Sequence, residues 1–206
     1  WYPSKIEQTL RVMHAGHQIV CHAERWINQN GLERIVKYGP ASRARYSHLL
    51  FDGNALSTSA VTMSTSLFKA AGGFSEKRAY ITAEDYDLWL NISQLGTSFY
   101  FIDSVLGEFR LHGENQSSAA ERNHRAIVEV LKFHFSTHVQ PTFINRIKIQ
   151  RRLGLAAYGC SRSLQTNKQF KPAYKWIARS ILLWPFGPKQ WAALLINIFR
   201  SLPFVN

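Results

Sequence analysis

The sequence predicts an α/β domain followed by an all-helical, basic region, and two observations carry this prediction. Up to about residue 118 helix-like and strand-like segments alternate, whereas beyond residue 120 the apolar residues recur only at helical spacing. The charges divide at the same place. Residues 1–119 hold 11 basic and 11 acidic side chains, and residues 120–206 hold 14 basic and 2 acidic ones, which accounts for the whole net charge of +12. We therefore expect two domains, residues 1–118 and 119–206.

The first region is expected to open with a helix over residues 3–14, with Pro3 in its first turn. Residues 16–31 contain two short strand-like runs that end at an Asn-Gly turn signal. The elements expected next are a helix over 46–51, a strand over 59–64, a helix over 66–74 closed by two glycines, and two strands over 98–103 and 104–111.

A further helix is expected over residues 82–95, after the helix over 66–74 and before the strand over 98–103. Thr82 is an N-cap type of residue, and the acids Glu84, Asp85 and Asp87 suit the positive end of a helix dipole. Leu88, Trp89, Ile92 and Leu95 supply its apolar stripe.

The second region should contain only helices, because prolines separate its four periodic segments. These segments are 121–138, 142–165, 170–184 and 188–202. None of them reaches the run of about 18 apolar residues that a membrane-spanning helix needs.

Composition narrows the class of protein. Of 206 residues, 46% are hydrophobic and 18% charged, which is typical of a globular chain and excludes a disordered one. The two cysteines, Cys21 and Cys160, are too few for a disulfide framework, so a reducing, cytoplasmic setting is favoured. The chain begins at Trp1 without a signal-peptide pattern, and we expect it to be a piece of a longer protein.

Three segments carry chemistry that a binding or catalytic site could use. A carboxylate at a helix start, such as Asp85, can act as a general base, although ordinary N-terminal helix acids look the same. Asn54 follows a glycine on a turn, where it either contacts a ligand hydroxyl or serves the turn itself. Arg110 and His112 alternate at the end of a strand and would point to one side, as donors to a diphosphate or as structural residues.

Together these segments resemble the C-terminal half of family-two glycosyltransferases, over about residues 1–118. The resemblance rests on the order GNALSTSAVTMSTSLFKAAGGF, AEDYDLWLNISQLG and FYFIDSVLGEFRLHGENQSS. It implies the C-terminal part of a GT-A (Rossmann-like) domain. It also implies an Asp-x-Asp segment just upstream of Trp1, which would hold Mg²⁺ or Mn²⁺ against a nucleotide-sugar donor.

The resemblance also implies roles for individual residues. Asp85 matches the catalytic base and Glu84 its acidic, acceptor-binding neighbour. Asn54 matches an acceptor-side residue, and Trp89 an aromatic that packs under the base within the substrate site. Arg110 and His112 match residues near the diphosphate. The implied reaction is an inverting transfer of a sugar to an acceptor hydroxyl, in cell-surface polysaccharide or glycolipid synthesis. The alternative is a non-catalytic binding module derived from this fold.

The basic tail has its own expected partner. Its cations and tryptophans predict amphipathic helices on an anionic membrane, here the inner face of the plasma membrane, where a lipid-linked or growing glycan acceptor would lie. A solvated helical packing domain is the alternative, and nucleic acid is disfavoured because the helix faces are rich in aromatic residues. The residues that carry this expectation are Arg146, Lys148, Arg151, Arg152, Lys171, Lys175, Arg179, Trp176, Trp184 and Trp191.

Overall fold

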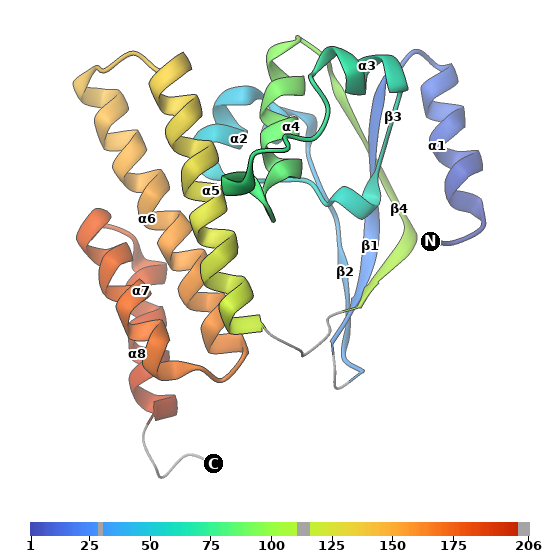
Figure 1. Cartoon of the computed structure of the whole chain (residues 1–206). Coiled ribbons are helices and arrows are strands. Elements are labelled where there is room, and N and C mark those ends of the chain that lie inside the picture. Colours follow the sequence, from blue (N-terminus) through green and yellow to red (C-terminus); the bar gives the residue numbers. More distant parts are fainter. Residues whose placement is uncertain (29–30, 111–115, 202–206) are drawn as a thin grey trace. The chain divides into compact units, whose positions relative to one another are not determined.

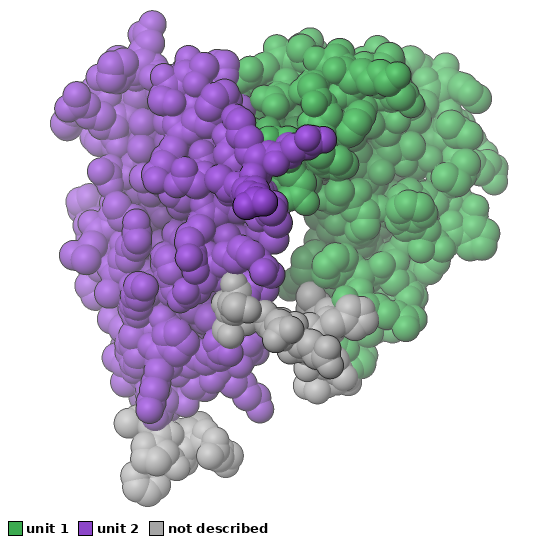
Figure 2. Space-filling model, viewed as in Figure 1, with its two compact units in different colours: residues 1–50, 54–75, 84–113 green, residues 51–53, 76–83, 114–206 purple. Residues whose placement is uncertain are grey.

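The structure is a computed structural model that describes residues 1–28, 31–110 and 116–201 of the chain (Figure 1). It has an α/β fold, as the sequence predicts, and divides into two compact units (Figure 2). Unit 1 consists of residues 1–50, 54–75 and 84–113, and unit 2 of residues 51–53, 76–83 and 114–206.

A mixed sheet built around strand β1 (Ile19–Ile27) forms the centre of unit 1. Strands β2 (Glu33–Val36) and β3 (Val61–Met63) pair antiparallel with the two ends of β1, and β4 (Phe99–Arg110) pairs parallel along its other edge. Helices α1 (Ser4–His14) and α4 (Glu84–Gln94) lie on opposite faces of this sheet (Figure 1).

Strands β1 and β4 are longer than the sequence predicts, whereas β3 covers only part of the strand expected over residues 59–64. Two short runs were expected within residues 16–31 and two more within 98–111, but each pair is one continuous strand. The expected boundary between the two later strands falls between Asp103 and Ser104. In β4 these two residues form a bulge, because His22 pairs with Ile102 and Ala23 with Val105. A bulge of this kind lets a strand continue past residues that do not pair.

Helices α2 (Tyr46–Asp52) and α3 (Thr65–Ala70) form where helices were expected. Three 3₁₀ helices (η) were not expected, η1 (Ala41–Ala44), η2 (Thr58–Ala60) and η3 (Arg78–Tyr80). Helix α3 is capped by Ser64, whose hydroxyl accepts a hydrogen bond from the Leu67 N–H.

The expectation that Thr82 caps the next helix is wrong. Helix α4 begins at Glu84, and Thr82 has a φ of 84°, in the left-handed region. An N-cap residue needs an extended backbone, so Thr82 belongs to the preceding turn. The acids Glu84, Asp85 and Asp87 do occupy the first turn of α4, as expected.

Helix α4 supplies much of the core of unit 1. Four apolar side chains after the acidic first turn, Leu88, Trp89, Leu90 and Ile92, are all at most 1% exposed. Burying side chains of this size contributes about 1.5–3 kcal/mol each. That packing fixes the orientation of the acidic turn.

Unit 2 is helical, and its four long helices follow the predicted segments. They are α5 (Gln116–His138), α6 (Phe143–Thr166), α7 (Phe170–Leu183) and α8 (Pro188–Ser201). Their common core contains Ala157, Cys160, Leu164, Ala173, Trp176 and Ile177. None of the helices within the described ranges is long and apolar enough to cross a membrane.

Several residues of the expected membrane surface lie inside unit 2 instead. Trp176 is 4% exposed and its indole donates a hydrogen bond to Glu121 at 3.0 Å. Arg152 is 5% exposed, and Arg151 forms an ion pair of 2.9 Å with Asp52. Trp176 and Arg152 are therefore enclosed within the unit, whereas Arg151 is paired but remains 39% exposed.

Candidate functional site

Asp85 is held at the first turn of α4 in unit 1, with its side chain half-buried. One carboxylate oxygen, Oδ1, accepts a hydrogen bond of 2.7 Å from the Tyr86 N–H. The other oxygen, Oδ2, accepts a hydrogen bond from the hydroxyl of Thr58. The carboxylate is therefore fixed at both oxygens, by its own helix and by η2.

The segment that carries Thr58 is anchored by its neighbour Ser59. The Ser59 hydroxyl donates to Glu24 Oε1 at 2.5 Å. The Ser59 carbonyl accepts two further hydrogen bonds, from Lys5 Nζ and from the Trp1 indole, each of 2.8 Å. Residues from α1 and β1 thus determine where Thr58, and through it Asp85, is located.

Glu24 is the buried centre of this network. It is 1% exposed, and its second oxygen, Oε2, accepts hydrogen bonds from Tyr38 at 2.6 Å and from Trp26 at 3.3 Å. Burial by itself would raise the pKa of Glu24, but the donors Ser59, Tyr38, Ser57 and Trp26 outweigh it and hold that pKa below its usual value. The carboxylate therefore stays charged inside unit 1.

Lys5 supplies the compensating positive charge. Its side chain is 2% exposed and its ammonium group lies 3.8 Å from the centre of the Trp1 ring. Burial lowers the pKa of Lys5, and the charge of Glu24 raises it in part. A buried charge is tolerated when it is paired and hydrogen-bonded in this way.

Comparisons with protein families, with curated proteins and with solved structures were made for the whole chain. No match was found in any of the three.

The remaining acceptor-side candidates differ in accessibility. Glu84 begins α4 and is half-buried beside Asp85. Asn54 is exposed, and its Oδ1 accepts a hydrogen bond of 3.0 Å from the Leu56 N–H, so the side chain oxygen serves the turn. Trp89 is 1% exposed in the core, where it packs beneath the acidic turn and offers no surface to a substrate.

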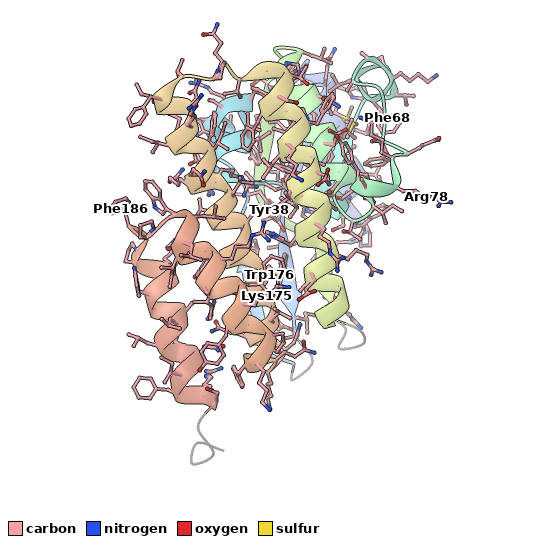
Figure 3. The ribbon with its side chains drawn as sticks, turned by 60° about the vertical axis from the view of Figure 1, so that its left-hand side comes forward. Tyr38, Phe68, Arg78, Lys175, Trp176 and Phe186 are labelled. Carbon is pink, nitrogen blue, oxygen red and sulfur yellow. The ribbon has the colours of Figure 1, made fainter. Side chains whose placement is uncertain are left out.

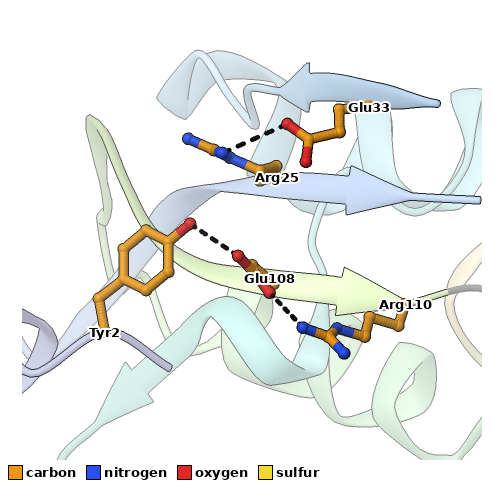
Figure 4. Close-up of polar contacts among 5 residues, drawn as sticks. All are labelled: Tyr2, Arg25, Glu33, Glu108 and Arg110. Atoms are coloured by element: carbon orange, nitrogen blue, oxygen red, sulfur yellow. Dashed lines mark hydrogen bonds and ion pairs between the residues drawn. The ribbon is translucent and has the colours of Figure 1, made fainter. Parts of the chain in front are cut away.

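The two candidates for diphosphate binding lie at the end of β4. Arg110 forms an ion pair of 3.2 Å with Glu108, which also accepts a hydrogen bond of 3.2 Å from Tyr2 (Figure 4). Within the described residues, no hydrogen bond or ion pair joins Arg110 to Asp85. His112 lies outside the described residues, so the expected pairing of its imidazole with Arg110 stays a prediction.

Sequence patterns did not reveal the network behind Asp85. Lys5, Glu24 and Tyr38 were not candidates. Glu24 stands beside Arg25 in the strand-like run IVCHAERWI, and the sequence does not distinguish which of these two charges is buried. His22 and Cys21 precede Glu24 on the same buried strand, and burial raises the pKa of the Cys21 thiol to about 12, so it is a packing residue.

A metal ligand set was expected outside this sequence. Within residues 1–28, 31–110 and 116–201, no three His, Cys, Asp or Glu side chains lie close enough together to hold a metal ion. Because the resemblance places the ligands of Mg²⁺ or Mn²⁺ upstream of Trp1, the metal stays a prediction.

Proposed function

We propose that unit 1 is the acceptor-side, C-terminal part of a GT-A glycosyltransferase of the family-two kind. The observation that carries this proposal is the fixed carboxylate of Asp85, oriented by Thr58 and by the Tyr86 N–H at the start of a buried helix. It belongs to the one motif, Glu84-Asp85-Tyr86-Asp87-Leu88-Trp89, in which the resemblance implies a catalytic base.

The proposed reaction is a single inverting displacement on a nucleotide-sugar donor. Asp85 accepts the proton of an acceptor hydroxyl while that oxygen forms a bond to the anomeric carbon. The bond from the anomeric carbon to the diphosphate breaks, and its electron pair leaves with the nucleoside diphosphate. Inversion follows because the acceptor attacks from the face opposite the leaving group.

Other side chains would position the reactants. Glu84 is suited to accept a hydrogen bond from a second hydroxyl of the acceptor, since it adjoins Asp85 on the same turn. The guanidinium of Arg110 is 68% exposed and suited to a phosphate oxygen, although it would have to exchange its partner Glu108. A cell-surface glycan or glycolipid remains the proposed acceptor.

The test compares wild type with Asp85→Asn, each expressed as the whole natural protein. Release of nucleoside diphosphate is measured over a panel of nucleotide sugars and acceptors, with Mg²⁺ or Mn²⁺. We expect turnover to fall about 10²–10⁴-fold in Asp85→Asn, the usual contribution of a general base.

The matched control is Asp103→Asn, the same chemical change at an exposed carboxylate whose partner is Lys37 at 3.5 Å. It should retain wild-type turnover. Equal activity of Asp85→Asn and wild type would assign the base to another residue. Binding of a nucleotide sugar or glycan without any turnover would support the non-catalytic binding module instead.

A further inference from the structure

Two polar side chains of helix α8 are buried in unit 2, while most of its large apolar side chains are exposed. Asn197 and Gln190 are at most 1% exposed. Asn197 Oδ1 accepts a hydrogen bond of 3.0 Å from Gln165, and its Nδ2 donates one of 2.9 Å to the Phe170 carbonyl. The helix is thus attached through these hydrogen bonds, through the small residue Ala193 and through the half-buried Leu194, while most of its other large apolar residues are exposed.

The opposite side of α8 is an exposed apolar surface. Its residues recur at helical spacing. Two exposed apolar residues precede α8 in the chain, Leu182 near the end of α7 at 84% exposure and Phe186 in the connecting loop at 78%. Phe186 points away from the helices of unit 2 (Figure 3). We call this surface the outer apolar face, and its residues are Leu182, Phe186, Trp191, Leu195, Ile196, Ile198 and Phe199.

Cations border the outer apolar face. Arg162 of α6 and Arg200 of α8 line one shallow hollow of about 240 Å³ together with Ile196 and Phe199. Arg162 donates a hydrogen bond of 2.6 Å to Gln165, and in the described part of the chain Arg200 has no acidic partner within 4 Å. A phosphate would find a guanidinium on either side of this hollow and apolar side chains at its wall.

The charge of the surrounding sequence indicates which kind of partner the outer apolar face would bind. Residues 130–206 contain 12 Lys and Arg residues and no Asp or Glu. A second copy of the chain would bring the same positive charges to the contact, which is unfavourable. Nucleic acid would match the charge but not the exposed Leu, Ile and Phe side chains. An anionic bilayer matches both properties.

We propose that the outer apolar face inserts into the surface layer of an anionic phospholipid bilayer, with a lipid phosphate in the hollow between Arg162 and Arg200. Trp191 is 47% exposed and sits on this face, where an indole suits the boundary between headgroups and acyl chains. The proposal does not depend on the transferase activity, since every residue in it belongs to unit 2.

The experiment is co-sedimentation of the full chain with vesicles of phosphatidylcholine, alone or mixed with phosphatidylglycerol. We expect binding to the anionic vesicles to be at least about tenfold tighter. Leu195→Ser with Phe199→Ser should weaken that binding about tenfold or more, because it removes two inserted side chains. Arg200→Gln should weaken it about fivefold on anionic vesicles and leave binding to neutral ones unchanged.

The matched control is Phe143→Ser with Ile144→Ser, two exposed apolar residues of unit 2 at the start of α6, away from α8 (Figure 1). This variant should bind as wild type does. All substituted side chains are exposed, and an unchanged circular dichroism melt would verify that each variant folds.

Three results would overturn the proposal. The first is equal binding, or no binding, to neutral and anionic vesicles. The second is wild-type binding by the Leu195→Ser, Phe199→Ser variant. The third is a dimer in sedimentation velocity that this double variant converts to a monomer, which would assign the face to a second copy of the chain.

Discussion

At the scale of single residues, the partners of each buried polar group determine whether it can stay charged. Glu24 and Lys5 remain inside because donors, acceptors and opposite charge replace the water that each has lost. The histidines His22 and His124 are different. His22 is fully buried, and each of them has one ring nitrogen without a hydrogen-bond partner. A positive charge on either ring would be poorly solvated, so both should stay neutral at pH 7.

The stability of the protein should therefore fall in mild acid. Burial lowers the pKa of His22 and of His124, so the folded chain binds fewer protons than the unfolded chain. Their contribution is fully present above the unfolded pKa of about 6.5 and is lost as the pH drops through the lower folded pKa. Urea unfolding at about pH 7.5 and pH 5 should show a loss of up to about 2 kcal/mol per histidine.

The variants His22→Gln and His124→Gln should each reduce this dependence of the unfolding free energy on pH. The control is His14→Gln, because His14 is exposed at the end of α1 and should leave the dependence unchanged. An unaltered pH dependence in both buried variants would assign the loss to other groups.

At the scale of elements, α6 shows how one helix combines local signals with long-range packing. Thr142 caps its start, accepting a hydrogen bond of 3.2 Å from the Asn145 N–H. Its two glycines have different surroundings. A methyl group at Gly154 would lie 2.9 Å from Trp184 Cβ and 3.3 Å from the Ser180 carbonyl oxygen, whereas nothing lies within 4 Å of one at Gly159.

Alanine substitutions at these two glycines should have opposite effects on stability. Gly154→Ala should destabilise the protein by about 1–3 kcal/mol, because it forces α7 away from α6 and disturbs the 2.7 Å hydrogen bond from Ser180 to the Gly154 carbonyl. Gly159→Ala should stabilise it by about 0.5–1 kcal/mol through helix propensity. Chemical denaturation measures both, and equal effects of one sign would show that α6 and α7 do not pack as described.

At the scale of the whole molecule, two units have separate cores and different charge. The core of unit 1 forms around its sheet and α4, and that of unit 2 lies among α5, α6, α7 and α8. All of the net charge of +12 belongs to residues 120–206, in unit 2. Each unit buries its own apolar surface, so each is expected to have its own stability.

Local perturbation of unit 1 should therefore leave unit 2 protected in amide hydrogen exchange. Glu24→Ala removes the acceptor for Ser59, Tyr38 and Trp26 and leaves Lys5 without its counter-charge. We expect a loss of about 3–5 kcal/mol in unit 1, seen as faster exchange in β1, β3 and β4. Protection in α6 and α7 should persist.

Glu33→Ala is the control, since Glu33 is an exposed carboxylate that pairs only at the surface with Arg25, at 3.2 Å. It should not change exchange in either unit. Loss of protection in α6 and α7 together with the sheet in Glu24→Ala would mean that the chain unfolds as one cooperative body.

The sequence by itself determined the α/β class, the four long helices, the position of the charge boundary and the acidic turn that carries Asp85. These features depend on residues close together in the chain, through periodicity, caps and prolines, and local patterns encode them. The catalytic role of Asp85 and the implied GT-A relationship also rest on local sequence patterns, and both remain proposals.

Only the tertiary structure decided which side chains are enclosed. It joined the predicted runs into β1 and β4, gathered Lys5 and Glu24 behind the segment that holds Asp85, and buried Trp176. It also turned the apolar side of α8 outward. Burial depends on which surfaces meet across long stretches of chain, and a charged or aromatic residue looks the same in the sequence whether its partner is water or another side chain.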